Sequence, residues 1–492
     1  MTRLFARIAG FFLLVTAATG ASAQEQAACR DCLTAQEARA DLASLYASLQ
    51  QEHVDLFARR SEAEYDAKIA ELRARISGPI AKPEFNLLVQ EALAFGNIGH
   101  SKTDAPVGDT IAYVQAGGTI VPLSIVYRGD SMLTEEWADT TDDMPPGSRI
   151  TRIGGMTMQQ FEDRARELIA ADTPRLLRAQ VEMALPVYLH QMFGPVDALA
   201  VEYVASDGTT RSREIAAMTY GEMLALQESR PVVRPERRAS TRIAREMPDD
   251  IYYLQPGPFF ATEEERGDGE GDYAIGAFSS FVDEAFAGMA RSGARDLLID
   301  LRGNPGGDAS FSDLIVARLV DEPFRHSSRY EIRAGANTKR IWQDREIDSD
   351  TLGGKVGSAI AAARVGERVA IELPSIEPID ENAFEGRVWL LVDKHSYSNA
   401  AVVAALMQDL DIATIMGEET ADLPTTYGAV ERFSLPNSGA SIVYPKAYMV
   451  RPSGSEEVRG VVPEYPIAPN PIGEKRDLML EAALTQIRAA RR

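Results

Sequence analysis

Apolar residues in the first part of the chain recur at intervals of three and four, the spacing of helices that bury one face. Pro83 precedes one such run and is a residue favoured in the first helical turn. We therefore predict a helical N-terminal domain over residues 24–105. The three runs are Leu42, Leu45, Tyr46 and Leu49; Tyr65, Ile69 and Leu72; and Phe85, Leu88, Val89, Ala92 and Leu93.

From about Ile111 the pattern changes to short apolar runs bounded by turn residues, which predicts strands. We predict a small β-rich module over residues 106–227, followed by an arginine-rich linker over residues 228–246 that contains two prolines. The strand-like segments are Val121–Tyr127, Arg149–Ile153 and Ala198–Val204, and Phe161–Ala170 has the spacing of a helix.

From Ile251 onward strand-like and helix-like segments alternate, as in an α/β domain with a largely parallel sheet. We predict this core over residues 247–470 and a final amphipathic helix within residues 471–492. One right-handed β-α-β crossover is expected inside the core. Its strands are Arg387–Val392 and Ala413–Met416, its helix is Asn399–Gln408, and Leu297–Leu301 is a further buried strand.

The first residues have the features of a secretory signal peptide. Arg3 and Arg7 accompany the apolar run Ile8–Ala18, and Ala21-Ser22-Ala23 is a small-residue cleavage site. The run is shorter than the ~20 residues that span a bilayer. We expect a signal peptide over residues 1–23, cleavage after its last residue, and a periplasmic or secreted protein without stable membrane insertion.

Composition narrows the classes of partner and cofactor. The chain of 492 residues is 45% hydrophobic and 25% charged, and its net charge of -22 would repel nucleic acid. Cys29 and Cys32 are the only cysteines. Such a C-x-x-C pair can be redox-active, but we favour a short-loop disulfide in an oxidising compartment. No metal or dinucleotide motif is present, so no cofactor is expected.

A candidate nucleophile lies in the segment Leu390–Ala401, where a buried strand ends, a polar turn follows and a helix begins. A hydroxyl there would lie at the carboxyl end of the sheet, where open α/β folds bind ligands. The helix N-terminus would also favour a developing oxyanion. Ser398 is the candidate, although an ordinary helix-capping serine would occupy the same position.

A glycine-rich turn, Asp300–Gly307, follows a neighbouring predicted strand. Adjacent glycines let backbone N–H groups approach a substrate closely, as an oxyanion hole requires. The turn and the Val392–Ser398 segment together resemble the C-terminal-processing (tail-specific) serine peptidases. The resemblance implies a crotonase-like (α/β/β) core that cleaves peptide bonds and places the nucleophile on Ser398 rather than Ser396. It covers about Ile251–Ile467, and residues 146–155 resemble a diverged PDZ signature.

The chain departs from the bacterial tail-specific enzymes at their catalytic lysine. That lysine follows a Gly-Glu-x-Thr-x-Gly motif, and Leu423 stands at its position after Gly417–Thr420. A Ser–Lys dyad of that type is excluded, and neither Lys394 nor Lys446 stands at the family position. The chain is instead similar to a lysine-less branch with a tricorn-core-like Ser/His/Glu arrangement.

In that branch, the histidine comes from a glycine-flanked turn and the glutamate stands three residues before a Gly-x-x-Pro motif. These features fall on His100 and Glu457 here. The resemblance thus implies Ser398 as nucleophile, His100 as general base and Glu457 as an orienting carboxylate. The oxyanion would be held by backbone N–H groups of Gly306, Gly307 and Asn399.

Some alternatives remain open at the level of sequence. His395 is a rival base because it lies close to Ser398 in the chain, and Glu456 is chemically equivalent to Glu457. The expected function is that of an exported serine peptidase acting on extended or C-terminal peptide segments. The alternatives are an inactive peptide- or ligand-binding protein on the same fold and a hydrolase of other esters or amides. We assign structural roles to His53, His190 and His326.

Overall fold

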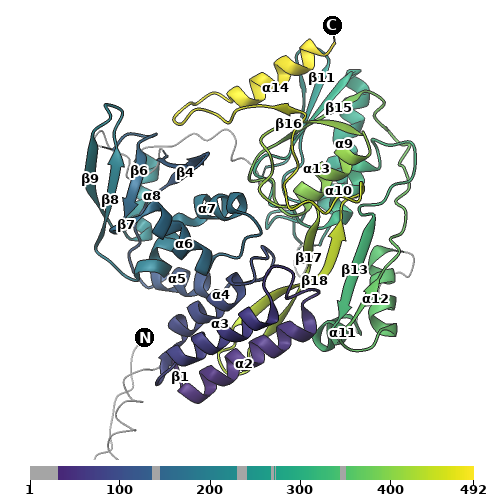
Figure 1. Cartoon of the computed structure of the whole chain (residues 1–492). Helices are drawn as coiled ribbons and strands as arrows, with labels where there is room; N and C mark the ends of the chain where they lie inside the picture. The colour runs from purple at the N-terminus through teal and green to yellow at the C-terminus, as the bar shows by residue number, and fades with distance from the viewer. Residues whose placement is uncertain are drawn as a thin grey trace, which may run out of the picture.

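The computed structural model describes residues 31–135, 144–229, 241–267, 271, 273–343 and 351–491. The predicted signal peptide and part of the predicted linker lie outside the described residues. Figure 1 shows three parts: N-terminal helices, a β-rich module beside them, and a larger core that contains the C-terminal half of the chain.

The described N-terminal residues form three helices, which confirms the helical pattern of this region. The first two begin at capping boxes, in which Thr34 pairs with Glu37 and Ser61 with Glu64. Their apolar faces pack together and against Ile442 and Tyr444 of the core. Cys32 is disulfide-bonded, and Cys29 lies outside the described residues. The elements are β1 (Cys32–Leu33), α2 (Ala35–Glu52), α3 (Glu62–Arg75), β2 (Ile80–Ala81) and α4 (Lys82–Ala94).

The β-rich module is an antiparallel sheet with strand order β4-β5-β6-β8-β9, and β7 lies beside β6. Its strands are β4 (Ile125–Arg128), β5 (Ser131–Thr134), β6 (Arg149–Ile153), β7 (Met156–Thr157), β8 (Ala198–Val204) and β9 (Thr210–Ala216). Its helices are α5 (Ala105–Gln115), α6 (Met158–Leu168), α7 (Pro174–Phe193) and α8 (Tyr220–Ser229). The pattern of apolar residues did not predict α7, which contains Pro186 and departs from helical backbone angles at Ala184.

The main sheet of the core has strand order β10-β11-β12-β15-β16-β19, and all pairs except β10–β11 are parallel. Helices α9, α10 and α13 pack on one face and α14 on the other. The strands are β10 (Ile243–Met247), β11 (Ile251–Gln255), β12 (Asp296–Asp300), β15 (Arg387–Val392), β16 (Ala413–Gly417) and β19 (Tyr465–Pro466). The helices are α9 (Gly276–Ser292), α10 (Ala309–Val316), α13 (Asn399–Asp409) and α14 (Leu478–Ala489).

A second, antiparallel sheet completes the core, with strand order β14-β13-β18-β17. Its strands are β13 (Arg329–Ala334), β14 (Glu367–Ala370), β17 (Thr426–Ser434) and β18 (Ser441–Val450). Helices α11 (Ala336–Gln343) and α12 (Leu352–Ala362) accompany it. The two sheets and their helices confirm the predicted mixed α/β class. The structure differs from the pattern at β10, which joins the main sheet although its residues fall in or next to the predicted linker.

Two features of this topology determine where the candidate site lies. Strands β12 and β15 are parallel neighbours, so the turns that follow them lie side by side at the carboxyl edge of the sheet. The short strand β3 (Lys102–Thr103) pairs with β18, which fixes the turn containing His100 against the core. The connection between the N-terminal helices and the β-rich module therefore reaches the core at this point.

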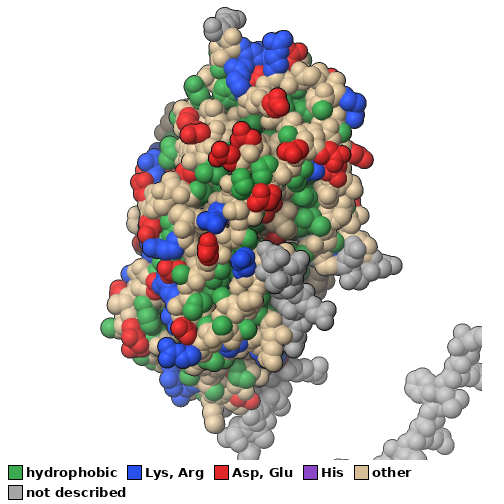
Figure 2. Space-filling view, turned by 90° about the vertical axis from the view of Figure 1, so that its right-hand side faces the viewer, with side chains coloured by type: hydrophobic (Ala, Val, Ile, Leu, Met, Phe, Trp, Pro, Cys, Tyr) green, Lys and Arg blue, Asp and Glu red, His purple; other side chains and the backbone are tan. Residues whose placement is uncertain are grey.

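The surface offers no simple guide to partners. Figure 2 shows acidic and basic side chains interspersed with hydrophobic ones over the visible face of the molecule. Within the described part of the chain, none of the helices combines the length and the apolar character needed to cross a bilayer.

Candidate active site

Ser398 lies at the tip of the turn between β15 and α13, with a φ of 53° and a ψ of -124°. A positive φ is uncommon for a residue with a side chain and is maintained only where the surroundings impose it. The Ser398 side chain forms no capping hydrogen bond with helix α13. This geometry disfavours the ordinary N-cap interpretation and leaves the hydroxyl available for another partner.

The turn around Ser398 is held by buried hydrogen bonds on both sides. The N–H of Ser398 donates to Oδ2 of Asp422 at 2.6 Å. The N–H of Tyr397 donates to the carbonyl of Asn304 at 2.9 Å. Oγ of Ser396 donates to the carbonyl of Leu301 at 2.7 Å and is fully buried. Ser396 therefore ties the turn to the neighbouring glycine-rich turn, whereas none of these bonds uses the hydroxyl of Ser398.

His100 is the histidine that the fold brings to this hydroxyl. Its Nε2 lies 3.4 Å from Oγ of Ser398, and its ring stacks on Tyr397 with 5.4 Å between ring centroids. The next residue, Ser101, is hydrogen-bonded through Oγ to Nε2 of the buried His53 at 3.0 Å. These contacts hold the imidazole beside the carboxyl edge of the main sheet. The histidine and the serine are 298 residues apart in sequence.

Burial lowers the pKa of His100 to about 4 because the imidazolium form loses its hydration. The carboxylate of Asp172 acts in the opposite direction, and the charge of Lys102 adds to the lowering. The side chain is therefore neutral at pH 7, the form that can accept a proton. Its Nδ1 is buried and has no hydrogen-bond partner among the described residues.

Two buried carboxylates flank the Ser398–His100 pair, and sequence reasoning assigned neither to the site. Asp172 accepts the N–H of Gly99 at 2.8 Å, and burial raises its pKa. Burial also raises the pKa of Asp422 to about 6. Asp172 lies in the loop between α6 and α7, in a different part of the fold from His100, so no local motif links them. Asp422 stands next to the Leu423 position that marks the missing lysine.

The structure does not join Glu457 to His100 by any hydrogen bond between described residues. Its side chain is exposed, and its backbone N–H donates to Oγ of Ser455 at 3.4 Å. Glu456 accepts from the hydroxyl of Tyr448 at 2.7 Å and pairs with Arg329 at 2.9 Å. Among the described residues no hydrogen bond joins either glutamate to the imidazole.

The glycine-rich turn lies directly beside Ser398. A Cβ on Gly306 would fall 2.7 Å from the Cβ of Ser398, and one on Gly307 would fall 2.1 Å from the carbonyl oxygen of Phe259. The N–H of Gly306 donates to Oδ1 of Asn304 at 2.8 Å, so this predicted oxyanion donor has a partner. No hydrogen bond within the described segments uses the N–H of Gly307 or Asn399. These two groups remain available to an oxyanion.

The rival bases have partners elsewhere. Nε2 of His395 lies 2.9 Å from Glu182, whose other oxygen lies 2.6 Å from Nζ of Lys394. Lys446 pairs with Glu431 at 3.2 Å. His190 stacks on Tyr113, and His326 is hydrogen-bonded to Asp313. Across the ranges that the structure describes, no three His, Cys, Asp or Glu side chains form a group that could hold a metal ion.

Comparison with known proteins identifies the core. Residues 273–467 match the model of peptidase family S41. Comparison of the sequence with curated proteins gives no match. Among solved structures, the chain resembles mature CPAF complexed with lactacystin, with 13% identity and a TM-score of 0.65 over 92% of this chain and 98% of that one. A second mature CPAF structure gives 13% identity and a TM-score of 0.63 over 88% and 92%.

The photosystem II D1 C-terminal processing protease is also similar, with 14% identity and a TM-score of 0.42 over 87% of this chain and 93% of that one. At these identities the structural matches establish the fold, while the family match identifies the domain. The expected relationship to the C-terminal-processing peptidases is confirmed at the family level. The chain contains a peptidase family S41 domain and is a serine-type peptidase.

Proposed function

We propose that this protein hydrolyses peptide bonds with Ser398 as nucleophile and His100 as general base. The observation that carries the proposal is the 3.4 Å separation between Nε2 and Oγ, with the serine at a positive φ on a helix N-terminus. Catalytic hydrogen bonds are commonly long in ligand-free enzymes and tighten when substrate binds. The arrangement needs only a small side-chain movement to become a proton-transfer pair.

The reaction follows from the positions of these groups. Nε2 of His100 takes the hydroxyl proton while Oγ of Ser398 attacks the carbonyl carbon of the scissile bond. In the proposed reaction the N–H groups of Gly307 and Asn399, for which the described residues offer no acceptor, hold the resulting oxyanion. The imidazolium then returns the proton to the leaving amine as the C–N bond breaks. Water attacks the acyl-enzyme in the same way and restores the serine.

Protonation of His100 during this cycle needs electrostatic support, because burial alone lowers its pKa to about 4. Asp172 supplies a negative charge near the imidazole, and its hydrogen bond to Gly99 also positions the turn. We assign Asp172 a positioning and charge-balancing role. Glu457 keeps the orienting role as a competing prediction, although its side chain is exposed.

The substrate in this proposal is an extended or C-terminal peptide segment, and the protein is exported through its predicted signal peptide. The alternative is an inactive peptide-binding protein on the same fold. Leu423, which stands where related enzymes carry lysine and is buried, is the observation that favours this alternative. A protein whose serine has no effective base would bind peptides and leave them intact.

Incubation of the purified protein with denatured casein separates these alternatives. We expect new peptide termini in the mass spectrum, and we expect a fluorophosphonate to prevent their formation. The Ser398→Ala variant, prepared in the same way, controls for contaminating proteases. Intact casein in the presence of folded wild-type protein would favour the inactive binder.

The two candidate carboxylates can be ranked by matched amide substitutions. Asp172→Asn is expected to lower kcat on the order of a hundredfold, less than the ~10⁴ seen where a carboxylate bonds the histidine directly. Glu457→Gln is expected to change kcat by less than about twofold, because exposed carboxylates are usually only solvated. Steady-state kinetics with one fluorogenic peptide measure both. The reverse ranking would restore the tricorn-like arrangement.

The pH dependence of fluorophosphonate labelling reports the pKa of His100. The base must be unprotonated, so the rate is expected to be constant near neutrality and to fall as pH decreases through about 4. An ordinary exposed histidine would instead give a midpoint near 6.5. The same profile in Asp422→Asn removes the other group expected to titrate, near pH 6. Circular dichroism at each pH checks that the protein stays folded.

A further inference from the structure

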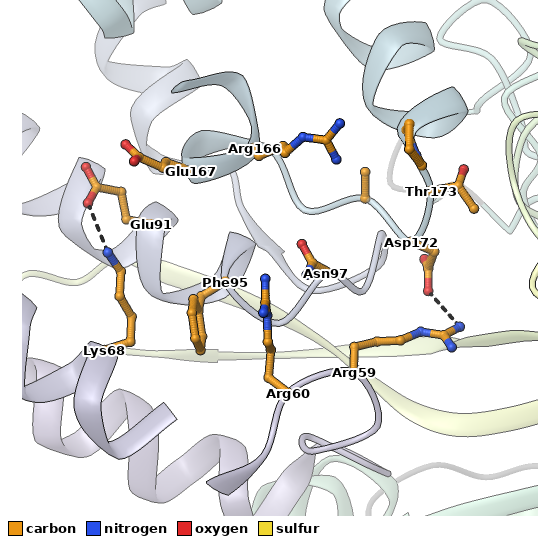
Figure 3. Close-up of a pocket in the computed structure, with 12 residues that line it drawn as sticks. Arg59, Arg60, Lys68, Glu91, Phe95, Asn97, Arg166, Glu167, Asp172 and Thr173 are labelled. Atoms are coloured by element: carbon orange, nitrogen blue, oxygen red, sulfur yellow. Dashed lines mark hydrogen bonds and ion pairs between the residues drawn. The ribbon is translucent and has the colours of Figure 1, made fainter. Parts of the chain in front are cut away.

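A pocket of about 440 Å³ lies where the N-terminal helices meet the β-rich module (Figure 3). Its volume is within the range of about 300 to 1,000 Å³ that is common for ligand sites. We call it the arginine pocket. The lining residues that the following argument uses most are Arg59, Arg60, Phe95, Asn97, Asp172 and Pro174.

The arginine pocket shares a wall with the turn that presents His100. Asn97 belongs to that turn and has a φ of 51°. Asp172 lines the pocket and accepts the N–H of Gly99 at 2.8 Å. Its neighbour Ala171 packs in the same apolar cluster as Tyr397, on which His100 stacks. A ligand in the pocket would therefore lie close to the candidate catalytic turn.

Two arginines at the pocket have hydrogen-bonding capacity to spare. Arg59 lies 3.5 Å from Asp172, and Arg60 lies 3.5 Å from Glu64. Charge-assisted hydrogen bonds are usually about 2.7–2.9 Å long, so both pairs are loose. Nε of each arginine is buried and has no acceptor within the described part of the chain. Because an unmet buried donor is costly, an acceptor that enters the pocket is favoured.

Arg166 also lines the pocket, 3.8 Å from Glu162, and adds a third guanidinium. The two glutamates of the lining are more completely engaged. Glu91 accepts from Arg75 at 2.5 Å and from Arg164 at 3.3 Å, and Lys68 also lies within 3.9 Å of it. Glu167 pairs with Arg164 at 2.5 Å. These carboxylates are balanced by partners of their own, so they oppose an incoming anion less than bare carboxylates would.

The remaining walls suit the stem of an amino-acid side chain or a peptide end. The guanidinium of Arg60 lies 5.0 Å from the centre of the Phe95 ring, a stacking contact that restricts its orientation. In Figure 3 Arg60 extends toward Asn97, and Arg59 reaches Asp172. Phe95 and Pro174 add apolar surface. The pocket thus combines planar cations with an apolar wall.

We propose that the arginine pocket is a subsite for a carboxylate of the peptide substrate, held by Arg59 and Arg60. A guanidinium fits the two oxygens of a carboxylate in a bidentate pair. The carboxylate belongs either to an acidic side chain or to the C-terminus of the peptide, because both present the same pair of oxygens. This inference rests on the proposed peptidase function and names the chemical class of its substrate.

The test starts from a set of casein peptides offered as substrates. Among those that contain acidic residues, the peptide that the wild-type protein cuts fastest is chosen. Three synthetic versions are compared: the free acid, the C-terminal amide, and a form with Asn and Gln in place of Asp and Glu. We expect kcat/KM to fall about tenfold or more for one modified version, the scale of a charged hydrogen bond. The modified peptide whose kcat/KM falls identifies the source of the carboxylate.

The double variant Arg59→Gln, Arg60→Gln should lose the same factor on the free acid, mainly through KM, and little on the affected modified peptide. Arg364→Gln is the matched charge control, because Arg364 lies outside the pocket and is highly exposed. Its kcat/KM should match the wild-type value. The labelling rate of Ser398 by a fluorophosphonate shows whether each variant keeps a folded active site.

Equal kcat/KM for all three peptides, or an equal loss on all three in the double variant, would overturn the subsite while leaving the peptidase proposal intact. Absence of any cleavage would instead count against the peptidase proposal. In that case we measure how much of the same casein peptides the Ser398→Ala variant retains, before and after amidation of the carboxylates of the peptides. Retention that does not depend on free carboxylates would then also overturn the subsite.

Discussion

Replacement of Ser398 by alanine is expected to lower kcat for peptide hydrolysis about 10⁶-fold, to the residual rate that binding and oxyanion stabilisation provide. The reason is that Oγ forms the bond to the acyl group, and the hydroxyl of Ser396 in the same turn is bonded to the carbonyl of Leu301. KM should change little, because the side chain contributes little to substrate binding. A continuous assay with a fluorogenic peptide and an active-site-titrated wild-type standard covers this range.

Ser396 provides the matched control for that experiment, because it lies in the same turn. Its Oγ accepts the N–H of Asp393 at 3.1 Å and donates to the carbonyl of Leu301. Ser396→Ala should cost about 1–3 kcal/mol of stability, since it leaves buried partners unpaired. It should nevertheless retain most of the peptide turnover at a temperature where it is folded. Loss of turnover in folded Ser396→Ala, with turnover kept in Ser398→Ala, would reverse the assignment.

Replacement of His100 by alanine is expected to lower kcat by a similar factor, about 10⁵- to 10⁶-fold, because serine and histidine act as one unit. A double variant with Ser398→Ala should be hardly slower than either single variant. Such non-additivity distinguishes a shared catalytic role from two independent structural losses. The measurement is kcat for the three variants with the same peptide.

His395 is the natural comparison for His100. Because it lies 2.9 Å from the buried Glu182, His395→Gln should affect stability more than chemistry. We expect its kcat to remain within about tenfold of wild type, far above that of His100→Ala. Near-wild-type turnover in His100→Ala would instead direct the search for the base to His395 or to a lysine.

The parts of the fold that sequence patterns predicted are those with a strong local signal. Strand β15 is a run of apolar residues after Arg387, and α13 directly follows the turn containing Ser398. By contrast, α7 contains Pro186, a residue that normally ends a helix, and its backbone departs from helical angles two residues earlier at Ala184, so the helix is kinked there. Strand β10 contains Arg245 and Glu246, both exposed, and it is recognisable as part of the sheet only through its pairing with β11.

The candidate site shows the same division between local and long-range information. Ser398 and the glycine-rich turn were predicted because each lies at the end of a buried strand. His100 was reached through a family resemblance, since nothing in the sequence alone places it 3.4 Å from Ser398. Asp172 and Asp422 were missed because isolated aspartates carry no motif. Their buried positions depend on how the β-rich module and the core pack around the turns.

The central claim is that His100 activates Ser398. Its most direct test is the site and rate of fluorophosphonate modification, measured by mass spectrometry of peptides from the wild-type protein and from His100→Ala. The account predicts a single adduct on Ser398 in the wild-type protein and a labelling rate lower by several orders of magnitude in folded His100→Ala. An adduct on another residue, or equal rates in the two proteins, would contradict it.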